Sequence, residues 1–489
     1  MAKTFQSHNP VTGDVLGKYP IASKSEVNTA VAQAAVAFER WSRDGFAKRR
    51  KALLAYSRAI LDRIDDLAQL VTLETGKPHS DAKLEIALAA HHIAWAARNA
   101  ESVLRVSHRS PGLLMANMSA TVERSPLGVV GVIGPWNYPV FTPMGSIAYA
   151  LAAGNTVVFK PSEYTPGVGV ELAQIFADVS GDHEIFQVVT GLGETGALLC
   201  SSAVKKLAFT GSTATAKKVA ALCAENLTPV IAECGGKDPV IVARDADIAA
   251  AADATVWSAL SNAGQTCIGA ERVYVDENVA DLFTQKVVAL ASAIHAGAPE
   301  SSHYGPATMP TQIKIIQSHI KDALKKGGVA ALGGVESVQD PFVQPVILLE
   351  VPEDSTAVTD ETFGPTLVIN RVPDMATAIK LANASRYGLG ASVWSRRQGK
   401  AIAARLQCGM VAINSTISFA SVASVPFGGV KDSGYGRIHG PEGLLEFTYA
   451  RSVVRARFKV PLATTSFKRT QKNDRLIVAI LKLIRGYLS

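Results

Sequence analysis

Short runs of β-branched and apolar residues alternate with helix-length segments from Gly128 onward, and this alternation is the strongest constraint on the fold. The first series comprises the runs GVVGVI, TVVFK, IFQVV, KLAFT, PVIA and PVIVA. Segments of helical length, such as 166–178 and 213–224, separate them. Because strands that alternate with helices form parallel sheets covered on both faces, this series predicts a doubly wound α/β domain.

A second series of the same kind follows and predicts a second α/β domain. It begins with ERVYV at residue 271 and continues through helices near 279–295 and 311–326. The later strands are PVILL, TLVIN, ASVWS and MVAIN. Two domains also suit the length, since 489 residues exceed what one hydrophobic core usually organises.

A helical segment precedes both series. Residues 24–107 have helical periodicity, and Ser23 with Glu26 forms a capping box that opens the first helix. The composition, 48% hydrophobic and 19% charged, is that of a globular protein without long disordered stretches.

The cysteines and the N-terminal sequence favour a reducing, cytoplasmic setting. Five cysteines, at 200, 223, 234, 267 and 408, contain no Cys-x-x-Cys pair and lack the spacing of a disulfide framework or a zinc site. The first ten residues lack the apolar region of a secretory signal. Prolines, glycines and asparagines interrupt the apolar stretch 126–158, which we therefore interpret as buried elements and not as a membrane span.

The net charge of +7 is concentrated at the C-terminus. Residues 451–489 contain ten Lys or Arg and one acid, Asp474, and so carry +9, which leaves −2 for the rest of the chain. The main domains therefore lack the basic surface that nucleic-acid binding requires.

Two glycine-containing loops follow strands of the first series. The segment 211–216 comes directly after KLAFT, where a helix N-terminus could hold a dinucleotide phosphate. A Gly-x-Gly-x-x-Gly pattern at Gly191, Gly193 and Gly196 follows IFQVV. A turn that merely precedes a helix explains this second pattern as well as a phosphate contact does.

One cysteine lies where a nucleophile could face a cleft. Cys267 ends the loop 262–267 between a helix and the strand ERVYV. Taken alone, a cytoplasmic cysteine is more often a small buried apolar residue than a nucleophile.

Seven ordered motifs decide between these interpretations. They are PWNYP (135–139), KPSE (160–163), FTGS (209–212), ECGGK (233–237), GQTC (264–267), ETFGP (361–365) and PFGGVKDSGYGR (426–437). Together they resemble the signatures of the aldehyde dehydrogenase superfamily, over about residues 5–460.

The resemblance implies oxidation of an aldehyde to a carboxylic acid by three catalytic residues. Cys267 would be the nucleophile, which a nicotinamide cation and helix N-termini could keep as a thiolate. The side chain of Asn137, with the backbone N–H of Cys267, would stabilise the oxyanion. Glu233 would be the base for hydrolysis of the thioester, and its presence favours hydrolysis over transfer to coenzyme A.

The resemblance also implies a nicotinamide dinucleotide site. Lys160 and Glu163 would hold the adenosine ribose, and Glu361 with Phe363 would position the nicotinamide end. The remaining expected cofactor contacts are Ile133, Trp136, Gly193, Gly211 and Ser212. Because the Glu163 carboxylate would repel a 2′-phosphate, NAD is expected to be preferred, with NADP possible.

The expected lining of the substrate tunnel is apolar. It comprises Tyr138, Thr142, Thr266, Ile268, Phe419 and Phe427. Without an evident cation, this set favours an apolar or aromatic aldehyde over the carboxylate-bearing substrate of a succinate-semialdehyde-type dehydrogenase, which is the alternative.

Two positions depart from the common family pattern. Cys234 replaces the usual leucine after the base, and Ala216 stands where a third glycine is frequent. We interpret Cys234 as packing, with oxidation near the nucleophile as the alternative, and expect Ala216 to be tolerated.

The resemblance implies a division into three parts and a tail. The cofactor domain would comprise 1–104 and 127–235, and the catalytic domain 236–447. Residues 105–126 and 448–462 would form a β flap through which the chain assembles into a homodimer or homotetramer.

Two other classes of protein fit the sequence less well. A thiol hydrolase with a histidine base would leave the nucleotide loops unexplained, and the ten histidines form no recognisable catalytic motif. A dinucleotide-binding protein without activity would not need Cys267, Glu233 and Asn137 together.

The tail 463–489 contains a basic amphipathic helix within 473–489. Its apolar face comprises Leu476, Ile477, Ile480, Leu481, Leu483, Ile484, Tyr487 and Leu488, and its basic face Arg475, Lys482 and Arg485. The segment is too short and too interrupted by charge to span a bilayer. Packing on protein explains the apolar face, whereas peripheral contact with anionic lipid also explains the charge.

Overall fold

The computed structural model describes residues 3–112, 115–459 and 466–483. The chain divides into two compact units. The main unit is Met1–Val103 with Pro126–Tyr449, and the small unit is Leu104–Ser125 with Ala450–Ser489.

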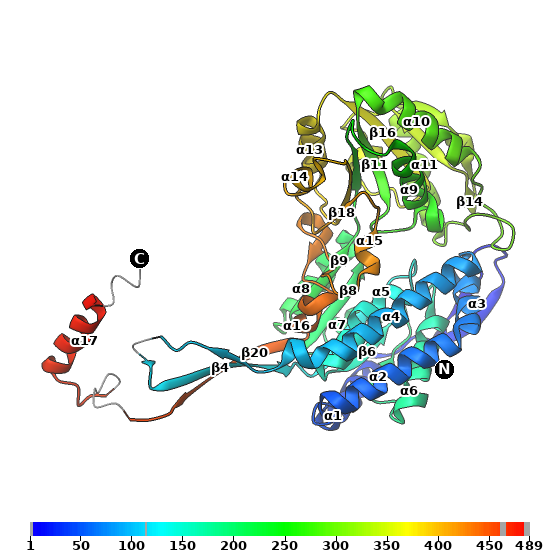
Figure 1. Cartoon of the computed structure of the whole chain (residues 1–489). Coiled ribbons are helices and arrows are strands. Elements are labelled where there is room, and N and C mark those ends of the chain that lie inside the picture. The colour runs from blue at the N-terminus through cyan, green and yellow to red at the C-terminus, as the bar shows by residue number, and fades with distance from the viewer. Residues whose placement is uncertain (1–2, 113–114, 460–465, 484–489) are drawn as a thin grey trace. The chain divides into compact units, whose positions relative to one another are not determined.

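The main unit contains a six-stranded sheet built from the first series of predicted strands (Figure 1). Its order is β19 (Gly434–Tyr435), β9 (Val230–Cys234), β8 (Lys206–Gly211), β5 (Val129–Ile133), β6 (Thr156–Lys160) and β7 (Phe186–Val188). Neighbouring strands from β9 to β7 are parallel, and β19 pairs with β9 antiparallel. The carboxyl ends of the parallel strands therefore meet at one edge, where ligands bind in such folds.

A seven-stranded sheet forms the other half of the main unit. Its order is β12 (Val329–Leu332), β15 (Val346–Leu349), β16 (Thr366–Val372), β11 (Ala270–Asp276), β10 (Asp238–Val242), β17 (Gly390–Trp394) and β18 (Met410–Ile413). All neighbours are parallel except β12 and β15. The run PVIVA, which we placed in the first series, is β10 and belongs to this sheet, because it pairs with β11 and β17.

Helices cover the sheets as the alternation predicts. Before and within the first series are α1 (Lys24–Trp41), α2 (Gly45–Asp62), α3 (Ile64–Thr75), α4 (His79–Leu104), α5 (Phe141–Ala153), α6 (Pro166–Ser180), α7 (Gly193–Cys200) and α8 (Thr213–Ala224). The second half has α9 (Ile248–Leu260), α10 (Glu277–Ser292), α11 (Pro310–Lys325), α12 (Thr356–Thr359), α13 (Met375–Ala384), α14 (Gly399–Ala403), α15 (Ser418–Ser421) and α16 (Gly440–Glu446). Short 3₁₀ turns are η2 (Ser261–Gly264), η3 (Val335–Ser337) and η4 (Lys431–Ser433), and two small hairpins are β1 (Thr4–His8) with β2 (Val15–Pro20) and β13 (Val338–Gln339) with β14 (Phe342–Val343).

Burial along β10 shows that the seven-stranded sheet is covered on both faces. Val240 and Val242 enter a core shared with α9 and α10. Ile241, whose side chain points to the opposite face, enters a core shared with α13 and α14. Figure 1 shows α9, α10 and α11 gathered around β11 and β16. A doubly wound α/β fold is therefore confirmed.

Local sequence explains several element ends. Ser23 and Glu26 form the predicted capping box of α1, with each side chain bonded to the other residue's backbone N–H. Pro166 opens α6, and Gly154 closes α5 in the left-handed conformation at φ 102°. No helix of the described residues has the length and apolar character needed to cross a membrane.

Within its described residues, the small unit contains a three-stranded sheet and one α-helix. The strand order is β20 (Thr448–Ala456), β4 (Met118–Pro126) and β3 (Ser107–Arg109). The helix is α17 (Gln471–Leu483), in which no residue is buried. Parts of two predictions lie outside the described residues: 113–114 and 460–462 of the flap, and 463–465 and 484–489 of the tail, which include Ile484, Arg485, Tyr487 and Leu488 of the amphipathic helix.

Candidate active site

Cys267 follows a strained turn that its sequence makes possible. After α9, residues Asn262, Ala263 and Gly264 all have positive φ, at 53°, 57° and 68°. A Cβ at Gly264 would lie 2.1 Å from the carbonyl oxygen of Gly364, so only glycine fits there. Such a turn persists only where surrounding structure enforces it, and it leaves Cys267 partly buried just before β11.

Glu233 lies near the end of β9 with its carboxylate almost fully buried. It is 3% exposed, and neither of its oxygens has a hydrogen bond of full geometry within the described residues. Its pKa is raised to about 8, mainly by burial and also by the nearby Asp238, while the adjacent Cys267 thiol and Thr210 act to lower it. The structure thus brings Glu233 and Cys267 close together.

Asn137 is tied to the same loop as Cys267. Its side-chain amide donates to the backbone carbonyl of Gln265 at 2.9 Å. The backbone carbonyl of Asn137 accepts from the side-chain amide of Asn262 at 3.1 Å. One of the two amide N–H groups of Asn137 is thereby used, and the second remains for an oxygen ligand. Asn137, Glu233 and Cys267 come from three separate segments and meet here.

The pKa of the Cys267 thiol is well above its usual value. Burial is the main cause, followed by the charges of Glu233, Glu361 and Asp238. We expected helix N-termini to favour the thiolate, but the groups that act most strongly on Cys267 favour the thiol. A cation brought by a ligand would oppose that effect.

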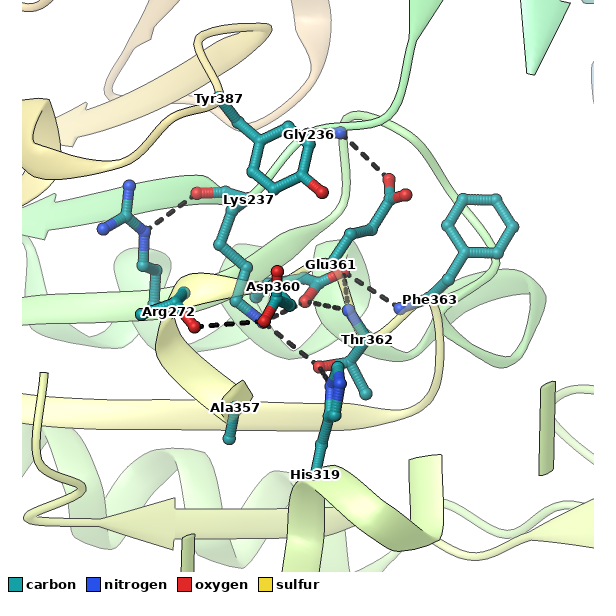
Figure 2. A network of polar contacts seen from close by, with 12 residues as sticks. Gly236, Lys237, Arg272, His319, Ala357, Asp360, Glu361, Thr362, Phe363 and Tyr387 are labelled. Atoms are coloured by element: carbon teal, nitrogen blue, oxygen red, sulfur yellow. Dashed lines mark hydrogen bonds and ion pairs between the residues drawn. The ribbon is translucent and has the colours of Figure 1, made fainter. Parts of the chain in front are cut away.

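Glu361 and Phe363 lie on a turn beside this cluster (Figure 2). The Glu361 carboxylate accepts the backbone N–H of Gly236 at 2.9 Å, and burial raises its pKa to about 8. The ring of Phe363 packs edge-on against Trp136, with centroids 5.7 Å apart. Glu361, Phe363 and Trp136, three of the residues expected to contact the cofactor, therefore lie close together.

A buried Lys–Glu pair supports that turn. Both carboxylate oxygens of Glu271 accept the backbone N–H of Thr362, and one also accepts that of Phe363 at 3.0 Å. The Lys237 ammonium donates to Glu271 and to the Thr362 hydroxyl (Figure 2). The Thr362 hydroxyl also contacts His319 Nδ1 at 3.1 Å.

The expected ribose contacts lie at and just after the end of β6. The Lys160 ammonium is 3.3 Å from the Glu163 carboxylate, and burial lowers the pKa of Lys160. Lys160 is buried, whereas Glu163 is partly exposed.

Two helix N-termini lie beyond the neighbouring strands. Ser212 caps α8 by accepting the backbone N–H of Thr215 at 3.3 Å, directly after Gly211. Gly193 opens α7 and is exposed, with no atom within 4 Å of an added Cβ. Space for a ligand therefore exists at Gly193, and Ala216 is accommodated within α8 as expected. The side chain of Ile133 is buried at the end of β5, in the core shared with α7 and α8.

The expected tunnel residues come from several segments, and four of them form two contacting pairs. Tyr138 and Thr266 share a hydrogen bond of 2.9 Å between their hydroxyls, and Ile268 is buried next to Cys267 in the chain. Phe419 and Phe427 pack together with ring centroids 6.5 Å apart. Thr142 lies in the first turn of α5.

Sequence reasoning missed several residues around this site. Lys77 and Glu85 bind the Asn137 segment, and Lys237 with Glu271 binds the Glu361 turn. The rings of His92 and His439 are tilted at 60° with centroids 4.2 Å apart, and none of their four ring nitrogens has a hydrogen bond of full geometry within the described residues. Lys237 was the one member within a quoted motif, and the others occur in segments without a chemical signature.

Comparison with known proteins identifies the family. The sequence profile of the aldehyde dehydrogenase family matches residues 1–453. The chain belongs to that family.

The relatives of this aldehyde dehydrogenase differ in what they are named for. It is 36% identical to 4,4′-diapolycopene aldehyde oxidase from Methylomonas, over 94% of this chain and 87% of that protein. It is also 36% identical to a putative NADP⁺-dependent succinate-semialdehyde dehydrogenase from Mycolicibacterium smegmatis, over 91% and 87% of the two chains. The crystal structure of an NAD-dependent aldehyde dehydrogenase from Sinorhizobium meliloti matches with a TM-score of 0.90 at 32% identity, over 95% and 93% of the two chains.

Cys234 of this aldehyde dehydrogenase is buried within the core of the six-stranded sheet. Burial raises the pKa of its thiol to about 12, and the charge of Glu233 adds to that effect. These features suit a packing role for Cys234.

Proposed function

We propose that this aldehyde dehydrogenase converts an aldehyde to a carboxylic acid through a covalent thioester on Cys267. The observation that carries the proposal is the convergence of Cys267, the buried Glu233 carboxylate and the Asn137 amide. A fold alone would not require these three groups to meet.

The Cys267 thiol first releases its proton to water. Attack by the resulting thiolate on the aldehyde carbon forms a carbon–sulfur bond, breaks the C=O π bond and places negative charge on the former carbonyl oxygen. The free N–H of the Asn137 amide stabilises that charge, because Gln265 already fixes the orientation of the amide. When the C=O bond re-forms, the aldehyde hydrogen leaves as hydride, and a thioester remains.

Hydrolysis of the thioester requires a base, and Glu233 is that base. Its pKa of about 8 means that the carboxylate forms near neutral to mildly alkaline pH and accepts a proton from water efficiently. Attack by the water releases the acid and returns Cys267 to its starting state.

A nicotinamide dinucleotide would supply the hydride acceptor. The chain offers matching groups: open space at Gly193, the capped N-terminus of α8 after Ser212, and the Lys160–Glu163 pair. The Glu163 carboxylate favours NAD over NADP, because it would repel a 2′-phosphate. Relatives are named for either cofactor.

The substrate proposed is an apolar or aromatic aldehyde. The Lys77 ammonium lies 4.0 Å above the Tyr138 ring but is bound by Glu85, so it offers no free charge to a substrate carboxylate. The alternative is a dicarboxylic semialdehyde, which the names of several relatives favour. Comparing kcat/KM for benzaldehyde, hexanal and succinate semialdehyde distinguishes them.

Two variants test the mechanism. Cys267→Ala should abolish NADH formation from aldehyde and leave NAD binding intact, since the nucleotide loops are untouched. Glu233→Gln should give a burst of about one NADH per active subunit and then stall at the thioester. Turnover near wild type in Cys267→Ala, or in Glu233→Gln without a burst, would contradict the assignment.

A homodimer or homotetramer is proposed, with β20 at the interface. Residues of β20 after Thr448 are exposed, although they include Val453 and Val454, and β20 is an edge strand of its sheet. An edge strand with exposed apolar side chains is suited to pair with a second copy.

Peripheral contact of the tail with an anionic membrane is proposed for α17. The helix has no buried residue, and its apolar side chains Leu476, Leu481 and Leu483 are exposed. The charge of +9 over 451–489 adds attraction of about 1 kcal/mol for each basic residue near an anionic surface.

A further inference from the structure

The segment that carries Asn137 has few means of fixing its own conformation. It connects β5 to α5, and two of its residues, Pro135 and Pro139, have no backbone N–H. At the start of α5, the N-cap Val140 provides no capping side chain. The first N–H groups of a helix need partners, so this segment depends on residues from elsewhere in the chain.

Lys77 and Glu85 supply those partners from outside the segment. One oxygen of Glu85, on α4, accepts the backbone N–H groups of Val140 at 2.8 Å and Phe141 at 3.1 Å. The other accepts from the Lys77 ammonium at 2.5 Å. Lys77 also donates to the backbone carbonyl of Asn137 at 2.9 Å.

The pair therefore binds the segment at two points. Glu85 holds its C-terminal end, where a carboxylate also suits the positive end of the α5 dipole. Lys77 binds the backbone of Asn137, whose side-chain amide is the proposed oxyanion donor. The Lys77 ammonium also lies over the ring of Tyr138. Lys77 is 1% exposed and Glu85 3%, so water does not compete for these bonds.

We propose that Lys77 and Glu85 are positioning residues for the oxyanion donor Asn137. The pair fixes the backbone of Asn137 against the loop of Gln265, so that the amide is in place before the oxyanion forms. This inference rests on the proposed function, because it takes Asn137 to be the oxyanion donor. Lys77 itself has no proposed contact with the substrate. A displacement of about 1 Å at such a site can cost about 10²-fold in rate.

The chain contains a matched pair for comparison. Lys237 and Glu271 are also a buried Lys–Glu ion pair whose glutamate accepts backbone N–H groups of a site segment. That segment carries Glu361 and Phe363 in place of Asn137 (Figure 2). Loss of either lysine removes the ion-pair partner of a buried glutamate, but only loss of Lys77 removes a hydrogen bond to Asn137.

A double-mutant cycle on the full chain tests the proposal. The rate of the first NADH formed in a single turnover, with saturating NAD and aldehyde, is measured for wild type, Lys77→Met, Asn137→Ala and the double variant. We expect about a 10- to 100-fold loss from Lys77→Met in the wild-type background, and less than about threefold in the Asn137→Ala background. Lys237→Met, the control, should reduce the rate by the same factor in both backgrounds.

Equal losses from Lys77→Met in the two backgrounds would overturn the proposal, because a general effect on folding multiplies whatever else is changed. If Lys77→Met does not yield folded protein, Glu85→Gln, which keeps the side-chain volume, is taken through the same cycle. Absence of aldehyde oxidation in wild type, or an unchanged rate in Asn137→Ala, would instead contradict the proposed function.

Discussion

At the scale of single residues, the site is defined by buried carboxyl groups whose pKa values are raised by burial. Glu233 and Glu361 both have a pKa of about 8, and in each case burial is the main cause. Each group is neutral at low pH and becomes charged only when pH approaches 8. The Glu233 carboxylate that hydrolysis needs is therefore formed only as pH approaches 8. The surroundings of Cys267 likewise favour its thiol over the thiolate.

Thioester hydrolysis should consequently depend on pH through Glu233. The pKa is raised, so the basic form is scarce below pH 7, and the hydrolysis rate should rise about tenfold per pH unit before levelling off above about 8. Rapid-quench measurement of acyl-enzyme decay gives this profile. A profile that stays flat between pH 6 and 9 would assign the base to another group.

Glu163 should determine the preference between cofactors. The ratio of kcat/KM for NAD to that for NADP should exceed one in wild type, because the carboxylate repels a 2′-phosphate. Glu163→Ser should reduce this ratio by about tenfold, as expected for loss of about 1.4 kcal/mol of discrimination. A wild-type preference for NADP would show that Glu163 does not contact the ribose.

At the scale of elements, helix caps made by neighbouring residues and buried hydrogen bonds between distant segments contribute differently to the free energy of unfolding. Asn155 follows α5 and is fully buried; its side chain accepts from Leu127 and Gly128 N–H and donates to the carbonyls of Ala150 and Phe447. It therefore joins α5, β5 and the residue after α16.

Asn155→Ala should destabilise the protein by about 3 kcal/mol or more, because several buried backbone groups lose their partners. Ser23→Ala, which removes only the exposed cap of α1, is the comparison and should cost about 1 kcal/mol. Urea denaturation at equal protein concentration measures both. A smaller effect for Asn155→Ala than for Ser23→Ala would contradict this ranking.

Flotation tests the role of α17. Full-length enzyme should float with vesicles rich in phosphatidylserine and lose this binding at high salt, whereas a form ending at Thr465 should stay at the bottom. Vesicles of phosphatidylcholine alone serve as the control. Equal recovery of the two forms with the anionic vesicles would leave α17 as a surface for protein packing.

At the scale of the whole molecule, assembly should depend on β20. One chain has a mass of 51.5 kDa, and light scattering after gel filtration should give about two or four times that value. Val454→Asp places a charge at an apolar position that is 61% exposed in the single chain, and the mass should then fall toward one chain. Ser119→Asp, at a partly exposed position on the neighbouring strand β4, provides a charge-matched control. An unchanged mass in Val454→Asp would place the interface elsewhere.

The sequence by itself determined the fold class and most of the elements. Strand runs and helix-length segments are local patterns, and α8 begins and ends at the predicted residues 213 and 224. The Ser23–Glu26 cap is equally local. The ordered motifs predicted Cys267, Glu233 and Asn137 as catalytic residues. The division into domains that the same resemblance implies stays a prediction.

Only the tertiary structure decided how those residues are held. Lys77 and Glu85 are 60 and 55 positions before the backbone groups they bind, and no periodicity connects residues so far apart. The local pattern grouped PVIVA with the first series, although the domain boundary implied by the resemblance put it in the catalytic domain. Its pairing with β11 and β17, which leaves no mark in a local pattern, shows that it belongs to the second sheet. The raised pKa of Cys267 has the same origin, because it results from burial and from carboxylates that the fold, not the chain order, places around the thiol.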